Sequence, residues 1–136
     1  MTDQDVTPAE QVVSVLIVDD QAPFRTSART VVGFTDGFEV VGEAETGEAA
    51  VEQVEALKPK LVLMDINMPG MGGIAATRKI TTEHPDVRVV LLSTYDADDL
   101  PADARTCGAA GYVHKEQFGP DVLTTLWEDG AGAAGA

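Results

Sequence analysis

Short apolar runs along the chain alternate with segments in which apolar residues recur every three or four positions. Continuous apolar runs bounded by turn-forming residues are typical of strands buried on both faces of a sheet. Apolar residues at helical spacing predict helices that pack one face against such a sheet. We predict strands over residues 11–18, 38–42, 61–64, 87–92 and 111–113. The helical stripes are Phe24, Ala28, Val31 and Val32, then Ala50, Val51, Val54 and Leu57, then Ile74, Thr77 and Ile80, and finally Val122, Leu123, Leu126 and Trp127, with a weaker helix over 98–107.

Five strands alternate in this way with five helices, and the links between them are short. The pattern predicts an α/β fold, a doubly wound five-stranded parallel sheet with helices on both faces. Thr46 is expected to cap the second helix with its side-chain oxygen. The predicted domain covers residues 12–128, between a disordered arm over 1–11 and a flexible Gly/Ala tail over 129–136.

Composition narrows the class of protein. A chain of 136 residues with 44% hydrophobic residues fits one globular domain. The net charge of −14 argues against direct nucleic-acid binding, which depends on Lys and Arg side chains at phosphates. The longest apolar run is far too short to span a membrane, and the acidic start does not resemble a signal peptide. Cys107 is the one cysteine, which fits a reducing compartment, so we expect a cytoplasmic protein.

Polar side chains follow four of the predicted strands at their carboxyl ends. They are Asp19 and Asp20 after the first strand, Asp65 after the third, Ser93 after the fourth and Lys115 close behind the fifth. The ends of parallel strands share one edge of a sheet, so these side chains should converge where open α/β folds bind ligands. Two carboxylates 4 Å apart repel by ~4 kcal/mol at an effective dielectric near 20, which a divalent cation such as Mg²⁺ would offset.

Asp65 opens the glycine-rich stretch Asp65-Ile-Asn-Met-Pro-Gly-Met-Gly-Gly73. A strand-end aspartate beside such a turn is more often a turn residue or a helix cap than a reactive group. The combination of side chains changes this interpretation, because lysine binds phosphate as a point charge and a hydroxyl can donate to a phosphoryl oxygen. With the acids and a metal ion they indicate phosphoryl transfer to a carboxylate nucleophile. The stretch is not a P-loop, since the Lys-Ser/Thr ending is missing.

Four motifs closely resemble those of the receiver domains of two-component response regulators. They are Asp19-Asp20, Asp65 to Gly73, Leu92-Ser93-Thr94 and Gly111-Tyr112-Val113-His114-Lys115, in the family's order and spacing, and the resemblance covers about residues 12–128. It is nearest to receivers that are usually joined to a helix-turn-helix DNA-binding domain. The resemblance implies the flavodoxin-like (βα)5 receiver fold. It also implies a signalling switch that catalyses only its own phosphorylation and dephosphorylation.

The resemblance also assigns the chemistry of the site. Asp65 would be the phosphoacceptor, phosphorylated by a sensor histidine kinase or a histidine phosphotransfer domain. Asp19 and Asp20 would hold Mg²⁺ together with Asp65 and the backbone carbonyl of Asn67. Lys115 would take the family's lysine position beside the phosphoryl group.

Further positions concern switching, lifetime and docking. Ser93 takes the hydroxyl position in preference to Thr94, because it directly follows the apolar run, and Tyr112 matches the aromatic switch position. The residues that would tune dephosphorylation are Asn67 and Tyr95, and those on the helix that helps to dock the kinase are Arg25 and Arg29. A homodimer on activation is a further expectation.

Three departures from the family pattern stand out. Glu116 occupies a position where many receivers have proline, so the cis peptide bond familiar after the lysine is not expected. The fourth helix carries Pro101 and an acid-rich start. No DNA-binding segment follows in this sequence, which implies either a stand-alone receiver or a receiver excised from a transcriptional regulator.

Two other functions stay open. An aspartate-nucleophile phosphohydrolase of the haloacid dehalogenase type usually carries a second acid two residues after the nucleophile, where this sequence has Asn67. A degenerate receiver that acts as a phosphorylation-independent interaction module should have lost an acid or the lysine, and none is lost. The remaining reactive side chains have ordinary interpretations: His84 and His114 at the surface, Cys107 in the core and Trp127 in packing.

Overall fold

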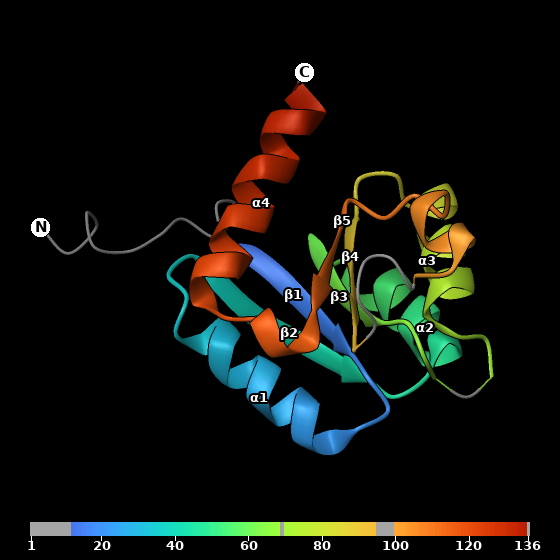
Figure 1. The fold of residues 1–136 in the computed structure, drawn as a ribbon, viewed down its shortest axis with the longest axis horizontal. Helices are drawn as coiled ribbons and strands as arrows, with labels where there is room; N and C mark the ends of the chain where they lie inside the picture. The colour runs from blue at the N-terminus through green and yellow to red at the C-terminus, as the bar shows by residue number, and fades with distance from the viewer. Residues whose placement is uncertain (1–11, 69, 95–99, 136) are drawn as a thin grey trace, which may run out of the picture.

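The sheet of five parallel strands lies between helices on its two faces, with strand order β2-β1-β3-β4-β5 (Figure 1). The computed structural model describes residues 12–68, 70–94 and 100–135, with the backbone alone for 128–135. The strands are β1 (Val13–Val18), β2 (Phe38–Ala44), β3 (Leu61–Asp65), β4 (Arg88–Ser93) and β5 (Gly111–His114). The helices are α1 (Ala22–Gly33), α2 (Gly47–Leu57), α3 (Gly73–Glu83) and α4 (Pro120–Gly135), with 3-10 turns η4 (Ala102–Arg105) and η5 (Lys115–Gln117).

The strand order confirms the predicted doubly wound fold. The chain starts at β1 in the interior of the sheet, adds β2 on one side, and then crosses back to add β3, β4 and β5 on the other. This is the flavodoxin-like order, in which ligands bind at the carboxyl ends of the strands where the winding reverses. That point lies here between β1 and β3.

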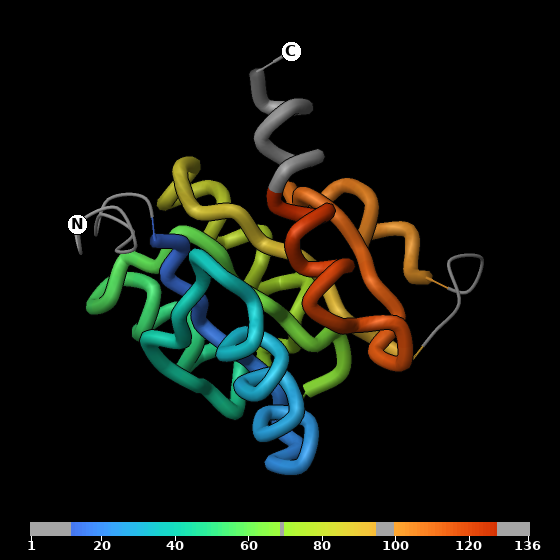
Figure 2. The backbone as a smooth tube through the Cα atoms, turned by 90° about the vertical axis from the view of Figure 1, so that its left-hand side faces the viewer, coloured from blue at the N-terminus to red at the C-terminus, as the bar shows by residue number. Residues whose placement is uncertain are grey.

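The core consists of one apolar layer on each face of the sheet. Helices α1 and α4 lie side by side over one face (Figure 2). Their apolar residues pack against alternate side chains of the strands. Helices α2 and α3 and the segment around η4 cover the other face. The predicted helical stripes are confirmed at Ala28, Val54 and Ile80, which are fully buried. Leu57 is the exception: it is the last residue of α2 and is 42% exposed, so it does not belong to the buried stripe. Thr46 caps α2 as predicted, because its Oγ1 accepts a hydrogen bond of 3.0 Å from the Ala49 backbone N–H.

The predicted fourth helix over 98–107 differs from the structure. Among residues 100–107, which are described, the regular element is the 3-10 turn Ala102–Arg105, and Pro101 precedes it in an extended conformation. The end of this segment is hydrogen-bonded to α3, because Thr81 Oγ1 donates to the Cys107 carbonyl over 3.1 Å. This contact takes the place of the predicted α-helix at Cys107. The burial of Ala104 and Cys107 supports the predicted stripe, but such small side chains give a helix little to pack.

Strand β2 carries one extra residue opposite β1. Val15 pairs with Val40, whereas the next residue, Leu16, pairs with Gly42, so Val41 forms a bulge. A bulge of one residue reverses the faces to which the following side chains point. Beyond it, Glu43 pairs with Ile17, whose side chain belongs to the layer under α1 and α4.

Helix α4 is anchored by its aromatic residue. The Trp127 ring packs edge-on against Phe38, with 6.4 Å between centroids, and Arg88 lies 4.1 Å from the centre of the Trp127 ring. This confirms the predicted packing role of Trp127. The helix continues to Gly135, through residues for which the sequence predicted a flexible tail. Adding residues to a formed helix costs far less free energy than nucleating a new one. Within the described residues, no helix is long and apolar enough to cross a membrane.

Candidate phosphorylation and metal site

The register of the sheet brings the predicted polar residues to one edge. Val18 pairs with Met64, so Asp19 and Asp65 follow at the same level on neighbouring strands. Asp65 in turn pairs with Leu92, which places Ser93 one residue further along β4. Ser93 pairs with His114, the residue before Lys115. The structure therefore brings together the rim that the sequence predicted.

Lys115 joins the two buried acids of this rim. Its Nζ lies 2.6 Å from Asp19 Oδ2, in an ion pair whose angles fall outside those of a hydrogen bond, and 3.4 Å from Asp65 Oδ1. The side chains of Lys115, Asp19 and Asp65 are 10%, 1% and 7% exposed, so water screens these charges weakly. The ammonium also lies 4.6 Å from the centre of the Phe24 ring. A cation is thus held beside two carboxylates in a largely dry site.

The backbone at the end of β1 is fixed by two further contacts. The Gln21 N–H donates to Asp19 Oδ1 over 2.8 Å, and Arg25 Nη1 donates to the Asp19 carbonyl over 2.7 Å. Asp19 is therefore held at one side-chain oxygen and at its backbone carbonyl. Asp20, the next residue, is exposed.

The pKa of Asp65 is raised from its usual value of 3.8 to about 6, chiefly by burial and to a smaller extent by the negative charge of Asp19. The ammonium of Lys115 and a hydrogen bond from the Asn67 backbone oppose these two effects without cancelling them. The structure thus has an excess of negative charge at this edge, because the single lysine does not compensate for the acids.

The acids at this edge suit a hard divalent cation. Asp19, Asp20 and Asp65 each offer a carboxylate oxygen, and these oxygens all lie within 4.8 Å of one another. Mg²⁺ in proteins is typically bound by a few carboxylates, and water molecules fill its remaining coordination positions. Asn67 is exposed two residues beyond Asp65.

Gly73 allows α3 to begin directly over the end of β3. Its N–H donates to the Ile66 carbonyl over 3.0 Å. A Cβ at position 73 would collide with the backbone carbonyl of Asp65 and come within 2.9 Å of Ile66 Cα. Both neighbours are backbone atoms, so no side-chain rotation could relieve the contact. The predicted tight glycine turn is therefore part of what holds Asp65 in place.

The remaining predicted residues fall at different places. Ser93 is buried at the end of β4, and Tyr112 is half-buried against the layer that includes α3. Tyr95 lies outside the described residues. Arg25 and Arg29 both pair with Glu43, but their side chains are 15% and 54% exposed respectively. Arg29 is thus the more accessible of the two.

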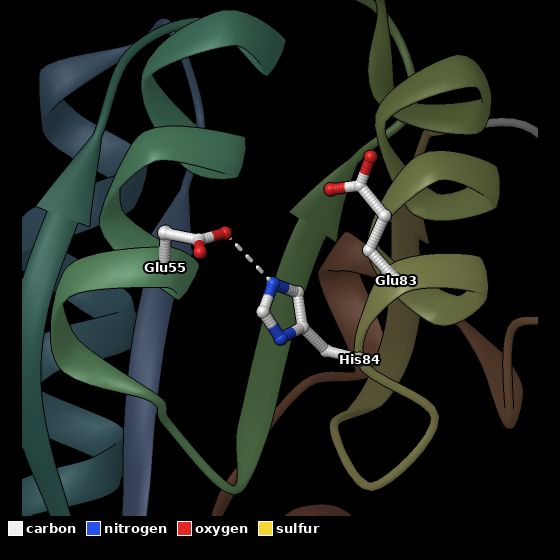
Figure 3. A group of neighbouring side chains, drawn as sticks. All are labelled: Glu55, Glu83 and His84. Atoms are coloured by element: carbon white, nitrogen blue, oxygen red, sulfur yellow. Dashed lines mark hydrogen bonds and ion pairs between the residues drawn. The ribbon is translucent and has the colours of Figure 1, made fainter.

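A second group of metal-capable side chains lies on helices α2 and α3, away from the rim. Glu55, Glu83 and His84 also offer atoms within 4.8 Å of one another, from the last turns of these helices (Figure 3). His84 Nε2 lies 3.1 Å from Glu55 Oε2, and Glu83 Oε2 lies 2.6 Å from Lys79 Nζ. Each carboxylate in this group already has a basic partner.

Sequence reasoning missed three residues of the rim's surroundings. Phe24 was assigned to the core stripe of α1 and also lies against Lys115. Gln21 contributes through its backbone, and Glu43 lies beyond the predicted end of β2. The spacing of Asp19 and Arg25 along the chain could have suggested their contact, whereas the pairing with Glu43 depends on the fold.

Fold and site define an α/β protein with an acidic, lysine-containing rim suited to phosphoryl transfer. The family pattern of the response regulator receiver domain matches residues 15–127, and the chain belongs to this family. It is 43% identical over 103 residues to the response regulator GacA of Pseudomonas viridiflava, covering 76% of this chain and 48% of that protein. It is 39% identical over 114 residues to the response regulator UvrY of Escherichia coli, covering 84% and 52%. The chain thus spans about half the length of these curated relatives.

Solved structures agree with this assignment. The signal receiver domain of the putative response regulator NarL from Mycobacterium tuberculosis has a TM-score of 0.81 at 30% identity, with 90% of this chain and 98% of that chain covered. A two-component response regulator of the LuxR family from Aurantimonas has a TM-score of 0.80 at 28% identity, with 89% and 86% covered. Receiver domains act in two-component signal transduction, interact with histidine kinases and generally bind Mg²⁺ through acidic residues.

Proposed function

We propose that this chain is a phosphorylation-dependent signalling switch in which Asp65 accepts a phosphoryl group from a histidine kinase or a histidine phosphotransfer domain. The observation that carries the proposal is the position of Asp65, at the end of β3 and beside Lys115 and Asp19 in a site closed to most water. A carboxylate in such a site is a nucleophile held by fixed charges.

In the transfer step, a carboxylate oxygen of Asp65 attacks the phosphorus atom of the donor. The P–O bond to Asp65 forms while the P–N bond to the donor histidine breaks, and its electron pair returns to the imidazole ring. Lys115, 3.4 Å from Asp65 Oδ1, lies where it can hold a phosphoryl oxygen. Mg²⁺ held by Asp19, Asp20, Asp65 and the Asn67 carbonyl would neutralise negative charge on the phosphoryl group.

The switch would follow from the added charge. A phosphoryl group brings about −1.5 to −2 charges, which attract the hydroxyl of Ser93 and the ammonium of Lys115. Ser93 is buried on β4 next to β5, which carries Tyr112. Movement of Ser93 would open space toward which Tyr112 can rotate, changing the surface around η4, β5 and α4 for a partner or a second copy of the chain.

The other assignments belong to the same proposal. Asn67 and Tyr95 tune the lifetime of the aspartyl phosphate, and the face of α1 with Arg25 and Arg29 helps to dock the kinase. The greater exposure of Arg29 favours it as the direct contact. The charge of −14 favours a protein output partner over nucleic acid. The single cysteine, Cys107, fits the reducing cytoplasm as the location.

Labelling by acetyl phosphate tests the proposal without a kinase. We expect the chain incubated with Mg²⁺ and acetyl phosphate to gain one phosphoryl group by intact mass, and EDTA to prevent this. Asp65→Asn should abolish labelling, whereas Asp86→Asn, which removes an exposed acid, should not. Labelling that survives in Asp65→Asn would place the acceptor elsewhere.

The same experiment distinguishes the alternative functions. Turnover of external phosphate esters without a stable adduct would indicate a hydrolase, against which the amide of Asn67 argues. No labelling of the wild-type chain would indicate a phosphorylation-independent interaction module. The retention of all three acids and of Lys115 in contact with two of them supports the switch over this module.

Ser93→Ala tests the coupling of phosphorylation to the surface. We expect labelling of Asp65 to persist in this variant. Beryllofluoride, a mimic of the phosphoryl group, should change amide hydrogen exchange over residues 100–114 in the wild-type chain but not in Ser93→Ala. Ser14→Ala is a matched control, since Ser14 lies at the opposite end of the sheet, on β1, where its Oγ accepts from the Lys60 N–H. A full response in Ser93→Ala would show that the hydroxyl does not transmit the change.

A further inference from the structure

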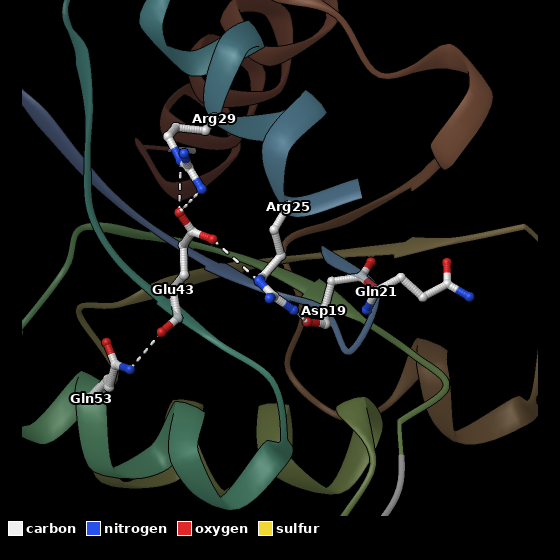
Figure 4. A network of polar contacts seen from close by, with 6 residues as sticks. All are labelled: Asp19, Gln21, Arg25, Arg29, Glu43 and Gln53. Carbon is white, nitrogen blue, oxygen red and sulfur yellow. Dashed lines mark hydrogen bonds and ion pairs between the residues drawn. The ribbon is translucent and has the colours of Figure 1, made fainter. Parts of the chain in front are cut away.

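Arg25 connects the end of β1 to the end of β2. Its side chain is 15% exposed, and its Nη1 donates to the Asp19 carbonyl over 2.7 Å while its Nε lies 3.2 Å from Glu43 Oε1 (Figure 4). A guanidinium can make both contacts at once because its donors are fixed in one plane. Such a side chain behaves as a rigid bracket between two strands.

The bracket is itself held at its second end. Glu43 Oε2 lies 2.6 Å from Arg29 Nη2, and the Glu43 carbonyl accepts a hydrogen bond of 2.6 Å from Gln53 Nε2 (Figure 4). Side chains from α1 and α2 therefore fix Glu43 by its carboxylate and by its backbone. Arg25 is thereby anchored to a point that cannot easily move.

The carbonyl that Arg25 holds belongs to the peptide bond between Asp19 and Asp20. A peptide unit is planar, so fixing its oxygen also fixes the direction in which the Cα of the next residue lies. The next residue is Asp20, the exposed member of the three acids at the rim. Gln21 N–H donates to Asp19 Oδ1 from beyond it, so Asp20 lies between two fixed points.

We propose that Arg25 is a positioning residue for the metal site, which aims the Asp20 carboxylate by holding the Asp19–Asp20 peptide plane. This inference rests on the proposed function, since it concerns the Mg²⁺ site at Asp19, Asp20 and Asp65. It gives Arg25 a role in the chemistry that is separate from docking a kinase.

The sign of the effect separates this role from simple electrostatics. Arg25 is a cation next to a cation site, so removing its charge alone should strengthen Mg²⁺ binding. Removing a bracket that orients a ligand should weaken binding, and loss of such outer contacts typically lowers metal affinity by about 10- to 100-fold.

Arg29 provides the matched comparison. Arg25→Met and Arg29→Met each remove one positive charge and the ion pair of that arginine with Glu43, but the Asp19 carbonyl loses its donor only in Arg25→Met. We measure the dissociation constant for Mg²⁺ by titration calorimetry on the full chain, after thermal melting confirms that each variant is folded. The dissociation constant of Arg25→Met should rise about tenfold over wild type and exceed that of Arg29→Met by a similar factor.

Arg25→Lys extends the test to a variant that keeps the charge. Lysine lacks the fork that spans Asp19 and Glu43 and retains the charge that repels Mg²⁺, so binding should weaken in this variant too. The Mg²⁺ concentration for half-maximal labelling by acetyl phosphate, which needs no kinase docking, should rise in parallel. An unchanged or lower dissociation constant in Arg25→Met would overturn the inference alone, whereas a wild-type chain that binds no Mg²⁺ would overturn the proposed function with it.

Discussion

Two groups of three side chains in this molecule bring potential metal ligands equally close, yet their surroundings differ. In the rim group of Asp19, Asp20 and Asp65, and in the distal group of Glu55, Glu83 and His84, the ligand atoms lie within 4.8 Å of one another. Two of the three rim acids are buried, whereas both glutamates of the distal group are exposed. The rim acids follow strand ends, and the distal residues lie at the ends of two helices.

The two groups differ in burial and backbone position, and these favour the rim over the distal group as the proposed metal site. In the distal group the ion pairs Glu55–His84 and Lys79–Glu83 are exposed to water, where such pairs typically contribute ~0–1 kcal/mol. At the rim, burial and the Asp19 charge raise the pKa of Asp65 to about 6, although Lys115 lies close by. Only the rim therefore holds a charge imbalance that a metal ion would relieve.

The backbone contact beneath the rim gives the largest expected effect. Gly73→Ala should lower the free energy of unfolding by about 3 kcal/mol or more, because the new methyl group meets the Asp65 carbonyl and the Ile66 backbone. Gly33→Ala is the control. An added Cβ at Gly33, at the end of α1, would meet no other part of the molecule within 4 Å, so this substitution should change stability little. Urea denaturation measures both variants. Equal stabilities would show that α3 can shift away from β3 at low cost.

The raised pKa of Asp65 predicts a stabilising substitution at the heart of the site. The folded state favours the protonated form of Asp65, so its ionisation opposes folding fully above about pH 6 and not at all below 3.8. Asp65→Asn should therefore stabilise the Mg²⁺-free chain at neutral pH by up to on the order of 3 kcal/mol, since the pKa of Asp65 is raised by about 2 and each pKa unit is about 1.4 kcal/mol.

This gain should shrink as the pH falls from about 6 towards 3.8, because the wild-type carboxyl group then becomes neutral too. Chemical denaturation at several pH values, without metal, measures it. Mg²⁺ should reverse the order, since it binds the wild-type site and stabilises it by mass action. A gain that is independent of pH would mean that Asp65 ionisation is not its source.

The Mg²⁺ affinity of variants in each group tests directly which of the two groups binds the ion. Asp20→Asn should weaken Mg²⁺ binding by about tenfold or more, because it removes the charge of a ligand at the rim. Glu83→Gln removes the same charge from the distal group and should leave the affinity close to wild type. Calorimetry measures both, and amide chemical shifts on adding Mg²⁺ should change around residues 19, 20 and 65. Shifts centred on residues 55, 83 and 84 would contradict the comparison.

The smallest effect is expected within the distal group. Glu55→Gln breaks an ion pair whose glutamate side chain is 67% exposed, so the free energy of unfolding should change by only about 0–1 kcal/mol. Thermal melting at low and high salt measures the change and its screening. A loss comparable with that of Gly73→Ala would mean that the helix ends are coupled to the core.

Most of the rim could be predicted from the sequence because strand direction turns linear positions into neighbours. Polar residues followed four of the five predicted strands, and a parallel sheet places such ends together. Asp19, Asp65, Ser93 and Lys115 met as expected. The tight turn over Asp65 could also be predicted, because its glycines are visible in the sequence.

Contacts between side chains on different elements could not be predicted in the same way. The pairing of His84 with Glu55 joins residues 29 positions apart and depends on how α2 lies beside α3. The helix predicted over 98–107 became a short 3-10 turn in its described part, since its apolar stripe is thin and its end is bound to α3. Local periodicity carries no information about such competing contacts.

The bulge at Val41 decides how β2 responds to a change in its length. Before it, Phe38 and Val40 pack on the side of α1, and if Val41 paired in regular register, Glu43 would point to the side of α2. Deletion of Val41 would remove the extra residue and keep Leu16 opposite Gly42, so Glu43 would still face Arg25. A library of single-residue deletions should therefore tolerate a loss at this position better than in β3, whose pairs with β1 and β4 run in continuous register.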